Sequence, residues 1–356
     1  MARLLPFAAL GFLLAACSAA PAATAAPLEL PTAPAYRLQP GDLVLAASPD
    51  DIPAIFATPE LFVDAAAGNA EWQDEEPVVG FAFNGEARAY PIRLLSLHEV
   101  VNDTIGGQPV AITWCPLCYS AIVFSRLVEG TELTFGVSGY LFKNNLVMYD
   151  HQSNTLWSQL LAQGLRGAHR GQALEILGVE HTTWGAWKTA HPATRVLSAS
   201  QMDRNAAEIV DPYVAYYTSG AAGLSGPTSD DRLPPKTLVL GLRISDQQRA
   251  YPFETVRQLG LIQDELAGQP ILLLYNPALN TVAVYLRRVD GQVLDFEAGE
   301  DAGRLQDGQT GSDWDAASGE ALTGPLQGAH LDPQHATTVF WFAWSGIFPD
   351  TEIFVE

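Results

Sequence analysis

The chain has 356 residues and is strongly acidic, with 40 Asp and Glu against 19 Lys and Arg and a net charge of -21 at pH 7. This charge argues against nucleic acid and anionic lipid headgroups as binding partners, and its simplest meaning is a solvated acidic surface. Beyond the first residues the sequence has no apolar run of 18 or more residues, which excludes a multispanning membrane protein and indicates a globular body.

The first 17 residues are predicted to be a lipoprotein signal peptide. Arg3 precedes an apolar run from Leu4 to Leu14, which is too short to span a bilayer as a mature helix. The run leads into "LAAC", which ends at Cys17 and resembles a bacterial lipobox, whose cysteine becomes the acylated N-terminus. An ordinary signal cleavage nearby, with Cys17 lost or left as a free thiol, is the alternative.

Residues 18–36 are rich in Ala and Pro and are predicted to be an extended tether. Several acyl chains on Cys17 would give stable membrane attachment. We therefore expect an extracytoplasmic, membrane-anchored lipoprotein that faces the periplasm or the cell surface, with the membrane as a partner through the lipid anchor.

The body of the chain contains an internal repeat. The segment "VVGFAFNGEARAYP", which ends at Pro91, matches "VLGLRISDQQRAYP", which ends at Pro252, at a spacing of 161 residues. After a four-residue deletion, a spacing of 157 residues aligns Trp184 with Trp341. Two copies of one domain of roughly 120 residues are therefore predicted, which is a normal domain size.

The predicted fold class is α+β and β-dominated, with two tandem homologous, pseudo-symmetric repeats and short helices. Each copy has hairpin signals, and a short helix is predicted after Pro91, after Pro252 and over "TTWGAWKTAH". The connector between the copies contains "DPYVAYY", which we expect to pack on the body. The predicted divisions are an N-terminal segment (37–76), repeat 1 (77–197), the connector (198–236) and repeat 2 (237–356).

Positions that carry chemistry in one copy and not in the other are candidates for function. We therefore predict that repeat 1 is the active copy and that repeat 2 is a degenerate, structural copy that buries one of its faces. The residues that change, each with its counterpart, are Cys115 (Asn276), Cys118 (Leu279), His98 (Leu259), Glu99 (Gly260), Met148 (Leu305), His151 (Gly308), His169 (Leu326), His181 (Thr338) and His191 (Phe348).

Cys115 and Cys118 are the most informative of these residues. They lie between two alternating segments, "VAITW" and "SAIVFSRL", which predicts a β-hairpin with the pair at an exposed turn. A thioredoxin-like site would place the pair at a helix N-terminus, and no helical pattern follows Cys118. Activation of a thiolate in this turn would need a side-chain cation, for which His98, Lys143 and Arg126 are the candidates.

Three interpretations of the pair remain open, and the sequence does not decide whether the protein is an enzyme. The first is a thiol/disulfide redox couple with Cys115, Cys118 and His98 in the site, which acts on a thiol-containing protein or a small oxidant. The second is a site for one Cu(I) or Zn ion. The third is a non-catalytic binding or scaffold lipoprotein with a structural disulfide. The metal ligands in the second case would come from Cys115, Cys118, His98, Met148 and His151.

The short loop between Cys115 and Cys118 favours the redox interpretation over the structural disulfide, because a disulfide that closes so short a loop removes only about 2 kcal/mol of unfolded-state entropy.

The segments "HEVVND", "WCPLCYSAIVF", "FGVSGYLFKNNLVMYD" and "DRLPPKTLVLGL" together resemble the DUF3179 family of extracytoplasmic bacterial and archaeal proteins, from about Asp50 to the last residues. The family's function is unknown, so the resemblance implies no reaction. It does imply that some members carry selenocysteine in this motif, which favours redox chemistry. Many members have Gly where this chain has Tyr119, and this departure weakens the prediction of a tight metal knuckle.

Overall fold

The structure is a computed structural model that describes residues 35–224, 230–299, 301 and 303–356. The predicted signal peptide, the lipidation site Cys17 and nearly all of the predicted tether lie outside these residues. Within them, no helix is both long and apolar enough to cross a membrane. The described residues belong to one compact unit.

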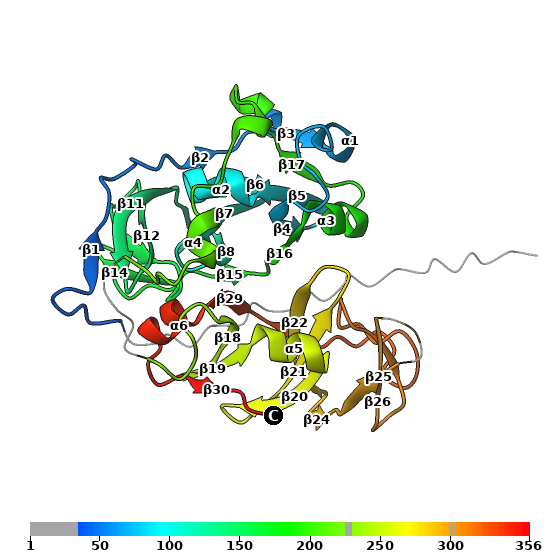
Figure 1. Cartoon of the computed structure of the whole chain (residues 1–356). Helices are drawn as coiled ribbons and strands as arrows, with labels where there is room; N and C mark the ends of the chain where they lie inside the picture. Colours follow the sequence, from blue (N-terminus) through cyan, green and yellow to red (C-terminus); the bar gives the residue numbers. More distant parts are fainter. Residues whose placement is uncertain (1–34, 225–229, 300, 302) are drawn as a thin grey trace, which may run out of the picture. The chain divides into compact units, whose positions relative to one another are not determined.

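Residues 35–200 build three five-stranded sheets, and Figure 1 shows their elements in blue to green. The first sheet has the order β16 (Glu180–Thr183), β4 (Pro77–Phe83), β5 (Glu86–Pro91), β17 (Arg195–Leu197), β3 (Phe62–Asp64). The second has the order β15 (Ile176–Leu177), β8 (Ser120–Ser125), β7 (Gln108–Cys115), β6 (Val100–Ile105), β2 (Ile55–Phe56). The third has the order β1 (Leu43–Leu45), β11 (Phe135–Phe142), β12 (Asn145–Asp150), β13 (Leu156–Ser158), β14 (Gln163–Arg166), and a small ribbon pairs β9 (Leu127–Val128) with β10 (Thr131–Glu132).

The described residues after position 236 build two four-stranded sheets and two smaller ones. Their orders are β29 (Ala336–Phe340), β18 (Leu238–Ile244), β19 (Gln247–Pro252), β30 (Glu352–Ile353); β20 (Leu261–Leu266), β21 (Gln269–Asn276), β22 (Thr281–Leu286), β28 (Asp332–Gln334); β25 (Phe296–Ala298), β26 (Arg304–Asp307), β27 (Asp313–Asp315); and β23 (Arg288–Val289) with β24 (Gln292–Val293).

The α-helices of the described residues are all short. They are α1 (Ala65–Gly68), α2 (Ile92–His98), α3 (Trp184–Ala190), α4 (Val214–Thr218), α5 (Phe253–Leu259) and α6 (Trp341–Ile347). Helices α2 and α5 begin directly after Pro91 and Pro252, because proline fixes a backbone angle that suits a helix start and lacks the N–H that would stay unpaired there. The predicted short helices and the β-dominated α+β class are therefore confirmed.

The two parts of the chain follow one order of elements. Strands β4 to β8 with α2 correspond in order and length to β18 to β22 with α5. Both parts also share a close approach of tryptophan to backbone: a Cβ atom on Gly80 would lie 2.3 Å from Trp187, and one on Gly241 would lie 2.4 Å from Trp344. The superposition of the two halves, and with it the predicted domain division, stays a prediction.

The hairpin that carries the cysteines forms as the alternating pattern predicted. Strands β7 and β8 pair antiparallel from Val110 and Ser125 to Cys115 and Ser120, and residues 116–119 form the turn. Cys118 therefore lies in a strand-turn-strand unit, and no helix begins at it.

The largest core cluster joins residues from both parts of the chain. It contains Cys115 and Cys118 with Met148 and Trp157 from the first part, and Phe340 to Ala343 from the second. The turn with the two thiols is therefore packed inside a core that the second part helps to build.

Candidate functional site

The two cysteines are free thiols and are buried, with 2% of Cys115 and 0% of Cys118 exposed. The expectation of an exposed turn is therefore wrong. The reason is long-range packing: residues far along the chain cover the turn, and hairpin signals in the local sequence do not report them.

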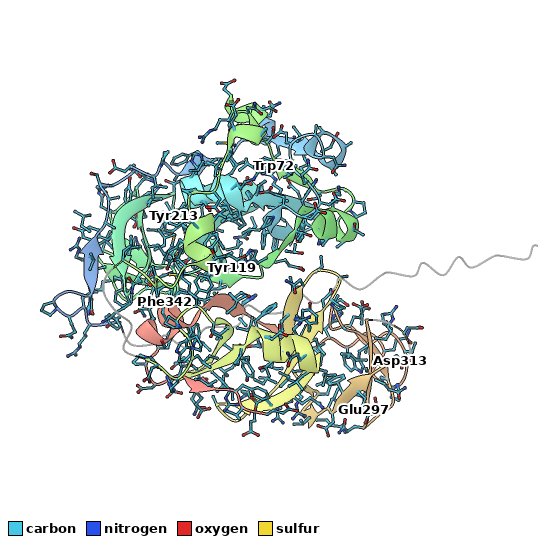
Figure 2. All side chains as sticks on the ribbon, viewed as in Figure 1. Trp72, Tyr119, Tyr213, Glu297, Asp313 and Phe342 are labelled. Carbon is cyan, nitrogen blue, oxygen red and sulfur yellow. The ribbon has the colours of Figure 1, made fainter. Side chains whose placement is uncertain are left out.

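Helix α4 of the connector forms part of this cover. The Tyr216 hydroxyl donates a hydrogen bond to the carbonyl oxygen of Leu117 in the turn, at 3.0 Å, and accepts one from the backbone N–H of Gly223, at 2.9 Å. Tyr213, the residue that precedes this helix, packs against the core cluster that contains the two cysteines (Figure 2). The prediction that "DPYVAYY" packs on the body is confirmed, and the surface that it covers is the cysteine turn.

Strand β29 forms the other part of the cover. The backbone N–H of Phe340 donates to the carbonyl oxygen of Cys118, at 2.8 Å. The Phe340 ring stacks on Tyr119, with ring centroids 5.3 Å apart. The second part of the chain is thus bonded directly to the turn.

Cys118 is held in its neutral form. Its sulfur lies 3.0 Å from the carbonyl oxygen of Asn144 and 3.6 Å from the amide nitrogen of Asn145, and its single S–H donates either to that carbonyl oxygen or to the Cys115 sulfur. Burial raises the pKa of the Cys118 thiol well above its ordinary value, and the neighbouring Cys115 raises it further.

The pKa of the Cys115 thiol is shifted in the opposite direction. Burial alone would raise the pKa of the Cys115 thiol, but hydrogen bonds from the Cys118 thiol and from the backbone N–H groups of Leu146, Cys118 and Leu117 lower it below its ordinary value. Cys115 is therefore the better nucleophile of the pair, because the thiolate is the reactive form.

Two of the candidate cations, His98 and Lys143, bond to groups other than the cysteine sulfurs. His98 Nδ1 lies 2.7 Å from the carbonyl oxygen of Pro53, and burial lowers the pKa of its imidazole, which favours the neutral ring. Lys143 forms an ion pair with Asp42, at 2.7 Å. Among the described residues, no hydrogen bond or ion pair joins either side chain to a cysteine sulfur.

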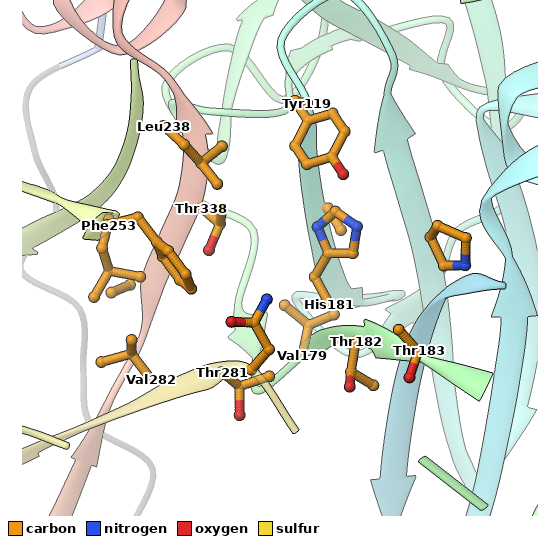
Figure 3. A pocket seen from close by; sticks show the side chains of 15 residues that line it. Tyr119, Val179, His181, Thr182, Thr183, Leu238, Phe253, Thr281, Val282 and Thr338 are labelled. Carbon is orange, nitrogen blue, oxygen red and sulfur yellow. The ribbon is translucent and has the colours of Figure 1, made fainter. Parts of the chain in front are cut away.

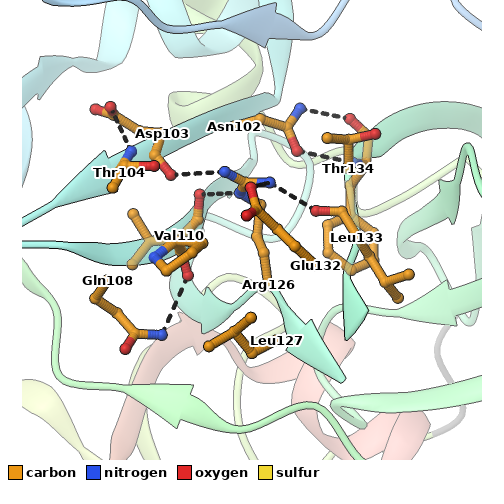
Figure 4. Close-up of polar contacts among 12 residues, drawn as sticks. Asn102, Asp103, Thr104, Gln108, Val110, Arg126, Leu127, Glu132, Leu133 and Thr134 are labelled. Carbon is orange, nitrogen blue, oxygen red and sulfur yellow. Dashed lines mark hydrogen bonds and ion pairs between the residues drawn. The ribbon is translucent and has the colours of Figure 1, made fainter. Parts of the chain in front are cut away.

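Arg126 is also committed to other partners. Its guanidinium donates to the carbonyl oxygens of Val110, Leu133 and Asp103, at 3.0, 2.7 and 3.0 Å (Figure 4). It also pairs with Glu132, at 2.9 Å. The lowered pKa of Cys115 thus comes from a second thiol and backbone N–H groups. The need for a side-chain cation to activate the thiolate stays a prediction.

The predicted metal ligands are brought together only in part. Met148 is fully buried in the core cluster that holds both cysteines, whereas His151 is exposed and bonds to Thr134. Over the described part of the chain, no group of three or more His, Cys, Asp or Glu side chains is placed to hold a metal ion.

Glu99 is a residue that the repeat comparison singled out but that none of the three interpretations of the cysteine pair included. It follows α2 in the left-handed conformation, with φ 56°, and its carbonyl oxygen accepts from the backbone N–H of Trp114, at 2.8 Å, next to Cys115. Burial raises the pKa of its carboxyl well above the ordinary value, and Cys115 raises it further. Its replacement by Gly260 in the repeat alignment is the signal that singled it out.

A hollow lies beside the turn, between β16 of the first part and β18, β22 and β29 of the second. It is a cavity of about 200 Å³ whose lining includes Tyr119, His181, Phe253 and Thr281 (Figure 3). Burial lowers the pKa of His181 to about 4, so this imidazole is neutral near pH 7. Tyr119 is the residue that this hollow shares with the cysteine turn.

The fold and the site define a β-dominated α+β protein with a buried, unequal pair of cysteines in a hairpin turn. The chain belongs to the DUF3179 family, described as a protein of unknown function, whose model matches residues 49–351. Neither a curated protein nor a solved structure matches the chain. The predicted family resemblance is therefore confirmed.

Proposed function

We propose that the protein is a thiol/disulfide redox protein in which Cys115 attacks and Cys118 resolves. The observation that supports this proposal most directly is the opposite shift of the two pKa values, lowered for Cys115 and raised for Cys118. Such a pair holds one sulfur ready to attack and the other as a protonated thiol.

The reaction follows from this asymmetry. The Cys115 thiolate attacks a substrate disulfide, a mixed disulfide forms, and one substrate thiolate leaves. Cys118 then loses its proton and attacks the Cys115 sulfur, which releases the second substrate thiolate. The protein ends with a Cys115–Cys118 disulfide, and two electrons have passed to the substrate. A protein disulfide or a small oxidant with a reducible sulfur bond fits this chemistry.

The pair needs an opening motion, because both sulfurs are buried. Helix α4 is the element to move, since it is only five residues long and has no buried residue. Its bond from Tyr216 to the turn is a single hydrogen bond, at 3.0 Å.

Two expectations from the sequence are also part of this proposal. The chain is a lipoprotein anchored through Cys17 and facing the periplasm or the cell surface, and its second half is a degenerate copy with a structural role. A clickable fatty acid should label the full chain and should not label Cys17→Ala. Label that persists in the variant would contradict the anchor.

Thiol counting combined with elemental analysis on one preparation tests the redox function. We expect two titratable thiols after mild reduction, none after mild oxidation, and no bound metal. Cys118→Ser should accumulate the mixed disulfide, and Cys115→Ser should lose the fast reaction. About one Cu or Zn per chain, with thiols that react only after chelation, would instead support the metal site. A disulfide that resists reduction until the chain unfolds would support the structural clip.

A further inference from the structure

The hollow beside the cysteine turn is lined by matching positions of the two halves. Its volume is about 200 Å³, and Figure 3 shows Tyr119 and His181 on one side of it and Phe253 and Thr338 on the other. The repeat spacings of 161 and 157 residues pair most of its lining residues with one another. Three of these pairs are Tyr119 with Asn280, Ala121 with Val282, and His181 with Thr338. The hollow is therefore a feature of the surface on which the two halves meet.

The first half contributes two polar rings to this hollow. Tyr119 and His181 lie against each other, with ring centroids 5.0 Å apart. Among the described residues, no hydrogen bond or ion pair reaches the Tyr119 hydroxyl or the His181 imidazole. The Thr281 hydroxyl, by contrast, already donates to the Glu180 carboxyl, at 3.4 Å. Polar atoms that line a hollow and have no protein partner are available to a ligand.

Tyr119 also has a strained backbone. Its φ is 56°, in the left-handed region, which is unusual for a bulky side chain. The paired residue of the second half, Asn280, has φ 54°, and asparagine adopts this conformation much more readily. The first half thus keeps a large ring at a turn position that suits asparagine. Strain retained in the wall of a hollow indicates a role in binding.

The lining defines the class of ligand. Among the described residues that line the hollow there is no Asp, Glu, Lys or Arg, so a charged group would enter without a partner, which is costly. The rings of Tyr119, His181 and Phe253 offer faces and edges to an aromatic ring. The volume suits one six-membered ring with small substituents, since a cavity of about 150 Å³ is large enough to bind benzene.

We propose that the hollow is a binding site for a small, uncharged aromatic molecule that carries a hydroxyl group, such as a monocyclic phenol. The ring of the ligand lies between the Tyr119 side and the Phe253 side of the hollow, and its hydroxyl bonds to the Tyr119 hydroxyl and the His181 imidazole. The site goes beyond the proposed redox function and does not depend on it, because binding transfers no electrons. It also gives the second half a share in a binding surface.

The test measures the binding of 4-methylphenol to the full chain at pH 7 by ligand-observed NMR in sealed tubes. The hydroxyl of this probe, like that of tyrosine, stays protonated at pH 7. Toluene keeps the ring and the methyl group without the hydroxyl, and 4-hydroxybenzoate carries a charged carboxylate in place of the methyl group. We expect saturable binding of one 4-methylphenol per chain, an affinity about fivefold to tenfold lower for toluene, and no measurable binding of 4-hydroxybenzoate.

Two variants locate the site. Tyr119→Phe keeps the ring and removes the hydroxyl, and His181→Thr copies the paired residue of the second half. Each should weaken the binding of 4-methylphenol by about fivefold to tenfold, the scale of one hydrogen bond, and Tyr119→Phe should leave the toluene affinity unchanged. His169→Leu is the matched control, because it copies Leu326 of the second half and His169 does not line the hollow. It should bind 4-methylphenol as the wild type does.

Three results would overturn the proposal. They are an absence of saturable binding to the wild type, an affinity for 4-hydroxybenzoate equal to that for 4-methylphenol, and 4-methylphenol binding that is unchanged in Tyr119→Phe and His181→Thr. If His181→Thr folds poorly, Tyr119→Phe still decides the question, since it changes a single oxygen atom. Each of these results leaves the redox function standing, because thiol counting tests that function separately.

Discussion

The backbone N–H of Phe340 donates a hydrogen bond to the carbonyl oxygen of Cys118, at 2.8 Å. These residues lie in different halves of the chain, and Phe340 is the last residue of β29. The half that lacks cysteines therefore fixes the backbone of the turn that carries them, and changes there should reach the thiols.

Phe340→Ala should destabilise the protein and also expose the turn. Loss of a buried phenylalanine costs about 3–5 kcal/mol, measurable by urea unfolding. Phe296→Ala removes a ring of similar burial in another cluster of the same half and serves as the control. Under native conditions the rate of thiol alkylation should rise in Phe340→Ala and stay near wild type in Phe296→Ala. Equal acceleration in both would mean that the thiols react only through global unfolding.

Gly80→Ala and Gly241→Ala should destabilise the protein by similar amounts, about 1–3 kcal/mol each, because the new methyl group would overlap a buried tryptophan ring. Gly178→Ala is the matched control, since its nearest neighbour, His335, would lie 3.7 Å away. Thermal unfolding of the three variants provides the comparison. If Gly241→Ala left the unfolding temperature unchanged while Gly80→Ala lowered it, the second half would tolerate a displacement of its tryptophan ring that the first half does not.

Asp307→Asn should lower the free energy of unfolding at neutral pH and should have a smaller effect on it in acid. Burial would raise the pKa of Asp307, but hydrogen bonds from Trp314, Thr310 and Ser312 outweigh it and lower the pKa below 3.8. The stabilisation is therefore complete above the unfolded value of 3.8 and is lost as the pH falls through the lower folded value. Urea unfolding from pH 7 down to pH 2 should show the two proteins converging. A constant difference across this range would contradict the prediction.

Tyr216→Phe should speed the modification of the thiols. The variant removes the hydrogen bond to Leu117, worth about 1 kcal/mol, which corresponds to about fivefold in an opening equilibrium. Val214→Ala changes an exposed residue of the same helix and is the control. Alkylation with iodoacetamide under native conditions gives the rates. Equal rates in all three proteins would show that α4 is not the element that opens.

The hairpin could be predicted from sequence because its cause is local. Alternating apolar residues on both sides of Pro116 define two strands, and the pairing of Cys115 with Ser120 follows from them. The helix after Pro91 is predictable for the same reason, since proline acts on its immediate neighbours.

The burial of the turn could not be predicted in this way. Its cover comes from Tyr216 and Phe340, far along the chain, and their contacts depend on how the sheets pack. The N–H group of Leu146 that lowers the pKa of Cys115 belongs to the backbone, which every residue shares, so no residue type marks it. Comparison of the repeats did single out Glu99, but only the structure shows that its carbonyl oxygen accepts a hydrogen bond from Trp114, the residue before Cys115.

The arrangement of the cover has a consequence for biosynthesis. Because a ribosome makes the chain from its N-terminus, the hairpin with both thiols is complete before Tyr216 and Phe340 have been synthesised. During that interval the sulfurs meet the oxidants and reductants of their surroundings without a barrier. The folded protein therefore starts with the oxidation state that the pair holds when β29 packs against the turn. Chains that fold in a reducing medium should start with two thiols, and chains that fold in an oxidising medium should start with a Cys115–Cys118 disulfide.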